Sequence, residues 1–175
     1  PENLHEFVDD AKVLPTGPVR VAAVVGDHLD PVTGSTVGGR TAYTLWGEIA
    51  SQLGDTAWEA VAEHDAARTA PGTGAIRQML DGGPAIIVID ELAQHLHSCA
   101  KSGSANVRNQ AEQIAPFLKN LSEEVAGRSD VAVVVTLAST SDAYASATEE
   151  LESVFKDIGA VLARQGRDIL PASET

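Results

Sequence analysis

The sequence predicts an α/β fold, built as a three-layer parallel sheet with helices packed on it. Three short apolar runs rich in β-branched residues are expected to form strands: VRVAAVV at 19–25, AIIVI at 85–89 and VAVVVTL at 131–137. Such runs, without alternating polar residues, are typical of strands buried on both faces. Helical patterns separate them, which predicts βαβ units. Three strands are few for this class, so the predicted sheet is partial.

The first part of the chain contains one predicted strand between two helical segments. Residues 2–10 are predicted to be the end of a helix, and the 19–25 strand follows. Residues 26–40 are rich in Gly, Pro and Thr, and a loop of this length is often functional. A helix is then predicted over 41–53, because its apolar residues recur at i, i+3, i+4 and i+7. These residues are Trp46, Ile49, Ala50 and Leu53.

Two more helices are predicted before the central strand. The first is expected to be capped by Asp55 or Thr56, since both residue types accept hydrogen bonds from a first helical turn. Pro71-Gly72 ends it. The next helix carries three apolar residues on one side and ends at Gly82-Gly83, just before the 85–89 strand. The three residues are Ile76, Met79 and Leu80.

The rest of the chain reads as two helices, a strand and a final helix. Residues 91–101 are predicted to be helical, and 106–126 form a longer amphipathic helix that Pro116 should kink or break. The strand 131–137 follows. The last helix is predicted over 145–164, with one apolar face. That face consists of Leu151, Val154, Phe155, Ile158, Val161 and Leu162.

Two adjacent carboxylates, Asp90 and Glu91, follow the central apolar run. Acidic residues at the carboxyl end of a parallel strand lie where open α/β sheets bind ligands. In nucleotide-hydrolysing sheets of the P-loop type, such an Asp helps to hold Mg²⁺ and a following Glu orients the attacking water. The alternative is that the acids only mark where the chain leaves the core.

The phosphate-binding half of such a site is absent from the sequence. No G-x-x-x-x-G-K-[ST] pattern occurs, and the Gly-rich stretches at 34–40 and 71–74 lack the required Lys. Lys101-Ser102 has no glycine loop before it. Either the nucleotide interpretation is wrong, or the phosphate-binding loop lies outside this chain.

Hydroxyl groups end the third predicted strand. A parallel sheet should place this strand beside the Asp90 strand, so Thr136 or Ser139 could contact a γ-phosphate or the attacking water. Ordinary capping at a strand end is the alternative for both residues.

Three further clusters favour structural roles. His95 and Cys99 could meet on one helix face, but His97 could not join them, so a metal site is disfavoured. The Glu63-His64-Asp65 cluster near Arg68 is expected to be a solvated helix face. Asp27 or Asp30 could approach a substrate, although a turn is the commoner reason for such residues.

Composition limits the possible partners and compartment. The chain has 175 residues, enough for one domain with a core, and a net charge of −13. The scarcity of clustered Lys and Arg argues against a broad nucleic-acid-binding surface on this chain. Nucleic-acid binding is therefore expected only through other parts of a longer protein. No apolar run could span a bilayer, and no signal peptide is evident. The single Cys99 fits a reducing, cytoplasmic setting. Both ends suggest a piece of something longer.

The order of these features resembles a family of large AAA-like P-loop ATPases from bacterial phage-defence systems of the phage-growth-limitation and BREX kind. Their ATPase domain was long catalogued as a domain of unknown function. The most specific match is Arg40-Thr41 with TLWGEIA at 44–50 and Gln52-Leu53-Gly54. The stretches 24–31, 62–72 and 86–92 also match, so the resemblance spans about 19–139.

The resemblance implies roles for the residues singled out above. Asp90 would be the Walker B acid that holds Mg²⁺, and Glu91 the catalytic Glu. Thr136 or Ser139 would occupy the sensor-1 position, where the motif is loose. The Walker A loop and its helix would come just before Pro1, so residues 1–175 would be the Walker B half of an AAA+ (ASCE-type) ATPase core without its first strand.

Two functions therefore remain. In the first, the intact protein hydrolyses ATP with Mg²⁺, in a phage-defence or DNA-associated complex, while this chain alone is inactive and binds no cofactor. In the second, the chain is a non-enzymatic α/β module whose acidic surface binds a protein partner. Either a protein partner or self-association is expected, because loss of the first strand would leave residues 131–137 as an unpaired sheet edge.

Overall fold

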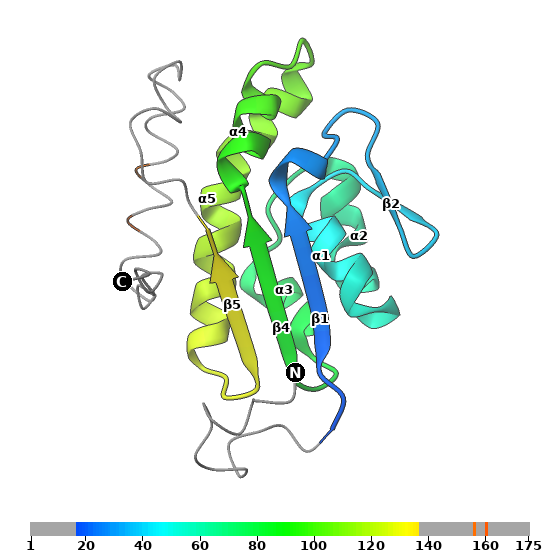
Figure 1. The fold of residues 1–175 in the computed structure, drawn as a ribbon, viewed down its shortest axis with the longest axis vertical. Helices are drawn as coiled ribbons and strands as arrows, with labels where there is room; N and C mark the ends of the chain where they lie inside the picture. The colour runs from blue at the N-terminus through cyan, green and yellow to red at the C-terminus, as the bar shows by residue number, and fades with distance from the viewer. Residues whose placement is uncertain (1–16, 137–155, 157–159, 161–175) are drawn as a thin grey trace, which may run out of the picture.

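A computed structural model describes residues 17–136 and, beyond them, only residues 156 and 160. Its centre is a parallel sheet of β1 (Arg20–Val25), β4 (Ala85–Asp90) and β5 (Val131–Val135), with β4 in the middle (Figure 1). β1 pairs with β4 from Arg20 opposite Ala85 to Val25 opposite Asp90. On the other side of β4, Ile89 lies opposite Val135. The predicted α/β fold with a parallel sheet is confirmed, as is the position of β5 beside the Asp90 strand.

Helices cover one face of this sheet. In Figure 1 the strands lie in front of α1 (Leu45–Leu53), α3 (Thr73–Leu80) and α5 (Ala105–Ala126). α1 packs on β1 and α5 on β5, while α2 (Asp55–Ala67) packs against α1 and α3. The strand side chains that point toward these helices are buried, and they include Ala22, Val24, Ile87, Ile89 and Val131. The described residues thus form two layers, a sheet and helices on one side of it.

An aromatic contact joins the helices at the centre of the core. Trp46 of α1 and Phe117 of α5 are fully buried, and their ring centroids lie 5.5 Å apart. Pro116, beside Phe117, lies inside α5 on its exposed side, and the helix continues through it to Ala126. Of the two effects predicted at Pro116, a kink or a break, the break is therefore wrong. An exposed position lets the ring face solvent while both halves of the helix keep their core contacts.

The segment predicted as one long loop contains regular structure. It begins with a short 3-10 helix, η3 (Gly26–His28), and continues into an antiparallel hairpin of β2 (Ser35–Val37) and β3 (Arg40–Ala42). Gly38 and Gly39 form the two-residue turn, with φ values of 58° and 78°. Two consecutive positive φ angles are typical of a type I′ hairpin turn, which favours Gly at both positions. The hairpin shows how two adjacent glycines organise this stretch.

The hairpin also shifts the start of the first helix. α1 begins at Leu45 rather than at residue 41, because residues 40–42 pair in β3. Thr44 is the N-cap, and its side chain accepts a hydrogen bond from the Gly47 amide at 3.0 Å. α2 instead follows Gly54 directly, without a side-chain cap, so the predicted capping roles of Asp55 and Thr56 are wrong.

The remaining bounds lie close to those predicted. α4 (Leu92–Ala100) follows β4, and β5 ends at Val135 with Thr136 immediately after it. The predicted helices over 2–10 and 145–164 lie outside the described residues, except that Lys156 and Ala160 are helical and exposed. No helix in the described part of the chain is long and apolar enough to cross a membrane.

Candidate functional site

The carboxyl ends of β4 and β5 bring Asp90 and Thr136 together. Asp90 is the last residue of β4 and Thr136 directly follows β5. The Thr136 amide donates to the Ile89 carbonyl at 2.9 Å, which extends the ladder between the strands by one position. The Thr136 hydroxyl then donates a short hydrogen bond to Oδ1 of Asp90. The juxtaposition expected from a parallel sheet is therefore present.

The backbone of Glu91 connects the same two side chains. Its amide donates to Asp90 Oδ1 at 3.0 Å and to the Thr136 hydroxyl at 3.2 Å. The Thr136 hydroxyl thus accepts from an amide while it donates to a carboxylate, a chain of hydrogen bonds that fixes its rotation. The two bonds that Asp90 accepts both reach Oδ1, and no described residue donates to Oδ2 of Asp90. The arrangement holds the carboxylate in place and, among the described residues, leaves Oδ2 without a hydrogen-bond donor.

Glu91 lies exposed at the junction of β4 and α4, in an unusual backbone conformation. Its φ and ψ are 52° and 36°, in the left-handed region, and Arg68 is the other non-glycine residue with positive φ in the described chain. This conformation costs a residue with a Cβ about 1–2 kcal/mol. Strained residues of this kind persist where the surroundings determine them, and they gather at functional sites.

Gly26 is one of the residues that surround Glu91 and limit its backbone conformation. It follows β1 as the first residue of η3 and is buried against the start of α4. A Cβ placed on Gly26 would lie 2.1 Å from the Glu91 carbonyl oxygen and 3.3 Å from the His95 amide nitrogen. Only glycine permits this approach of the two backbones. Gly26 is therefore a positioning residue that the sequence pattern did not single out.

The other acidic residues near the end of β1 have different surroundings. Asp30 accepts hydrogen bonds from the Val32 and Thr33 amides at 2.8 and 3.0 Å, and from the Thr33 hydroxyl. These bonds, led by the hydroxyl, lower the Asp30 pKa. Asp30 therefore builds a turn, as the commoner interpretation predicted. Asp27 and His28 are exposed, and their side chains lie 3.5 Å apart.

Asp65 does not lie on a solvated helix face, so that prediction is wrong for this residue. Its side chain is 2% exposed and accepts from the Tyr43 and Thr44 amides at 3.0 and 2.9 Å and from the Thr44 hydroxyl at 2.6 Å. Burial, the largest influence, raises its pKa, while the hydrogen bonds and Arg68 act in the opposite direction. A Cβ on Gly47 would lie 2.0 Å from Asp65 Oδ1. The Asp65 carboxylate thus accepts the hydrogen bonds of the backbone amides that precede α1.

The stretch that carries the most specific part of the family resemblance, at 40–54, therefore has a packing role. Glu48 of α1 is also buried, beneath the β2–β3 hairpin. Burial raises its pKa, and the Ser35 hydroxyl and the nearby His28 partly oppose that effect. These residues fix α1 against the hairpin and α2.

His95 and Cys99 meet inside α4, as their spacing predicts. His95 Nε2 lies 3.6 Å from Cys99 Sγ, and both side chains are buried. Burial lowers the pKa of His95 to about 4 and raises the pKa of Cys99 to about 12. His97 does not take part in this contact and is half-buried. Within residues 17–136, no three His, Cys, Asp or Glu side chains form a group that could hold a metal ion alone.

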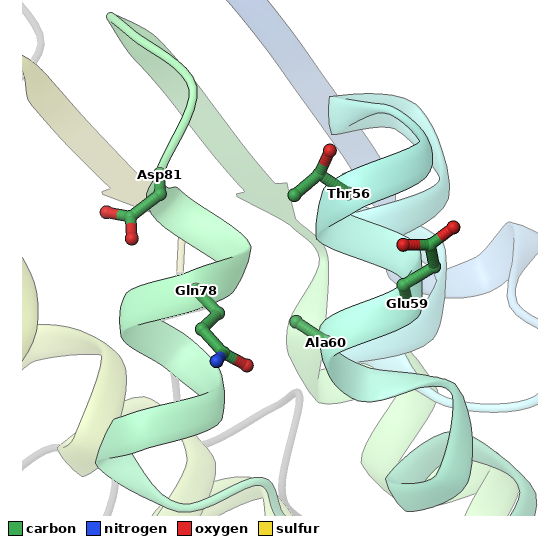
Figure 2. A pocket seen from close by; sticks show the side chains of 5 residues that line it. All are labelled: Thr56, Glu59, Ala60, Gln78 and Asp81. Atoms are coloured by element: carbon green, nitrogen blue, oxygen red, sulfur yellow. The ribbon is translucent and has the colours of Figure 1, made fainter.

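Two further observations complete the comparison with the predicted site. Ser139 lies outside the described residues. A shallow hollow between α2 and α3 is lined by Thr56, Glu59, Ala60, Gln78 and Asp81 (Figure 2). Asp81 comes shortly before β4 begins, so this hollow lies toward the amino end of that strand and not beside Asp90.

Comparison with known proteins identifies the family. No curated protein and no solved structure matches the chain. The sequence profile of the DUF499 N-terminal domain matches residues 1–169, which is nearly the whole length. The chain therefore belongs to the DUF499 N-terminal domain family, a domain of unknown function.

Proposed function

We propose that this chain is the metal-binding and water-activating half of an ATPase core, and that the intact protein hydrolyses ATP with Mg²⁺. The observation that carries this proposal is the hydrogen-bonded group of Asp90, Thr136 and the Glu91 amide at the carboxyl edge of a parallel sheet. Ligands bind at this edge in open α/β sheets. A DNA-associated or phage-defence role rests on the family resemblance alone.

The chemistry of each side chain fits this assignment. Mg²⁺ prefers oxygen ligands and is commonly held by one or two carboxylates together with substrate phosphates and water. Asp90 would supply that carboxylate, directly or through water. The exposed Glu91 would orient and deprotonate the water that attacks the γ-phosphate. Thr136 would position Asp90, and the family resemblance implies that Thr136 or Ser139 occupies the sensor-1 position.

The sheet topology supports the same proposal. Within the described residues β5 pairs only with β4, so its outer edge has no partner strand among them. A further strand carrying the phosphate-binding loop would pair there and place its loop beside Asp90. The sequence contains no G-x-x-x-x-G-K-[ST] pattern, so that loop would come from outside residues 1–175.

The intact protein provides the test. We expect Glu91→Gln to lower ATP turnover by at least about 100-fold, the range for loss of a general base, while Mg-ATP still binds. Asp90→Asn should weaken Mg-ATP binding as well. Glu63→Gln is the matched control, because Glu63 is an exposed carboxylate on α2. Normal turnover in Glu91→Gln would overturn the catalytic assignment and favour the protein-interaction module.

A further inference from the structure

The outer edge of β1 is closed by a side chain rather than by a strand. β1 pairs with β4 on one side and has no partner strand on the other among the described residues (Figure 1). On that outer side, the side-chain amide of Gln52 makes two hydrogen bonds to a single residue. Its Oε1 accepts from the Ala23 amide at 2.8 Å, and its Nε2 donates to the Ala23 carbonyl at 3.0 Å. A neighbouring antiparallel strand would make the same pair of bonds.

The helix behind the sheet carries Gln52 to this edge. α1 packs on β1, and Gln52 lies one residue before the end of that helix. Its neighbours Ile49 and Leu53 are buried in the core, whereas Gln52 is half-buried and extends to the outer side of the strand. A glutamine presents a donor and an acceptor together, which a carboxylate or an aliphatic side chain does not. The double contact with Ala23 therefore requires the amide.

Ala23 is the centre of the outer edge. The Arg20 amide points to the β4 side, where it donates a hydrogen bond of 2.9 Å. Backbone groups alternate in direction along a strand, so those of Val21, Ala23 and Val25 point away from β4. The side-chain amide thus occupies the middle one of three positions at which a further strand would bond. A strand cannot form a continuous ladder with β1 while that position is taken.

The sequence of the strand does not protect this edge. Residues 21–25 read VAAVV, without a charge or a proline, and such apolar segments pair readily with another chain. The charge that adjoins them, on Arg20, is directed elsewhere, because its guanidinium donates to the Leu80 and Gly83 carbonyls at 2.7 and 2.8 Å. Two common means of protecting an edge are therefore not used along residues 21–25, and Gln52 takes their place.

We propose that Gln52 prevents two copies of this chain from associating through β1. A two-fold axis at Ala23 would set two β1 strands antiparallel, with Ala23 opposite its own counterpart and Val21 opposite Val25. The two alanines would then exchange the N–H and C=O bonds that Gln52 makes within one chain. Because the same backbone groups serve either contact, the glutamine and the second copy exclude each other. This proposal does not depend on the ATPase assignment.

Replacement of Gln52 by methionine tests the proposal in the complete chain. Methionine keeps the unbranched shape of the side chain but offers no strong donor or acceptor to Ala23. At about 100 µM we expect Gln52→Met to have about twice the weight-average mass of the parent by sedimentation, because an isologous contact joins two copies. Gln78→Met is the matched control and should keep the parental mass, since Gln78 is exposed on α3.

A second substitution locates the contact. Adding Ala23→Lys to Gln52→Met would place two ammonium groups opposite each other across the two-fold axis, so the mass should return to that of the parent. Val134→Lys, at an exposed position on β5, should leave the association unchanged. A folded Gln52→Met chain with the parental mass overturns the proposal, because a residue that only fastens α1 to β1 would affect stability alone. Association that persists with Ala23→Lys overturns it as well.

Hydrogen exchange in the parent chain decides the matter if Gln52→Met does not fold. We expect the Ala23 amide to exchange at least tenfold more slowly than the Val21 and Val25 amides, after correction for intrinsic rates, because it alone of the three has a described acceptor. The rate should be the same at low and high protein concentration. Exchange of Ala23 as fast as that of Val21 overturns the proposal. Protection that appears only at high concentration also does, since a second copy would then hold the edge.

Discussion

Acid should destabilise this fold through one buried imidazole, that of His95. The side chain is fully buried in α4, its Nε2 faces Cys99, and its Nδ1 has no hydrogen-bond partner among the described residues. Burial lowers the His95 pKa from 6.5 to about 4, so the folded protein keeps the ring neutral where the unfolded chain protonates it. The folded state then binds fewer protons, and stability falls as the pH decreases from 6.5 toward 4.

The size of the effect follows from the same two pKa values. The fall from 6.5 to about 4, at 1.36 kcal/mol for each pKa unit, corresponds to about 3 kcal/mol in the free energy of unfolding. A typical domain has only about 5–15 kcal/mol in total, so this loss is a large share. The raised pKa values of Glu48 and Asp65 act in the opposite sense, because these carboxyls favour folding when they are protonated.

Urea unfolding at a series of pH values measures this contribution. His95→Leu removes the titrating group, and His97→Leu is the matched control on the same helix. Between pH 7 and pH 4.5 we expect the parent and His97→Leu to lose about 2–3 kcal/mol more than His95→Leu, because the carboxyl groups are common to all three chains. Equal pH dependence in the parent and His95→Leu would refute the reasoning, whatever the absolute stability of either variant.

Three further outcomes are expected. Gly26→Ala should destabilise the fold by about 1–3 kcal/mol, as overpacking does, because the new Cβ would lie 2.1 Å from the Glu91 carbonyl; unchanged urea unfolding would contradict that contact. Asp65→Ala should cost about 3 kcal/mol or more because it leaves the buried amide and hydroxyl donors of Thr44 unpaired, whereas Glu63→Ala should change little; equal effects of the two variants would refute the capping role. Calorimetric titration of the chain with Mg-ATP should show no micromolar binding, since the sequence has no phosphate-binding loop, and such binding would reveal a nucleotide site elsewhere.

The sheet could be predicted from the sequence because its strands are uninterrupted apolar runs. That pattern also predicted which side chains meet: parallel strands end at one edge, so Thr136 had to lie near Asp90 once β5 paired with β4. The β2–β3 hairpin was missed because its three-residue strands carry no apolar period. The adjacent Gly38 and Gly39 were the available signal, since a two-residue turn with positive φ favours glycine.

The buried position of Asp65 could not be predicted from the helix pattern. A carboxylate at a helix position between polar neighbours is usually solvated, and its burial here depends on amides contributed by Tyr43 and Thr44 from another part of the chain. The absence of a side chain at Gly47, which leaves room for Asp65, was the only local indication. Burial of a charge by distant partners is a tertiary effect that periodicity does not record.

The conformation of Glu91 links the fold to the proposed chemistry. The left-handed backbone at this position turns its amide toward Asp90 and Thr136, and the close approach of Gly26 holds its carbonyl on the other side. A glycine at position 91 would adopt this conformation without strain. The chain has a glutamate instead, and it is exposed at the carboxyl edge of the sheet. It lies beside the Asp90 carboxylate, whose Oδ2 accepts no hydrogen bond from the described residues. Strain that a simpler residue would relieve is a reason to look for the role of a side chain in chemistry rather than in folding.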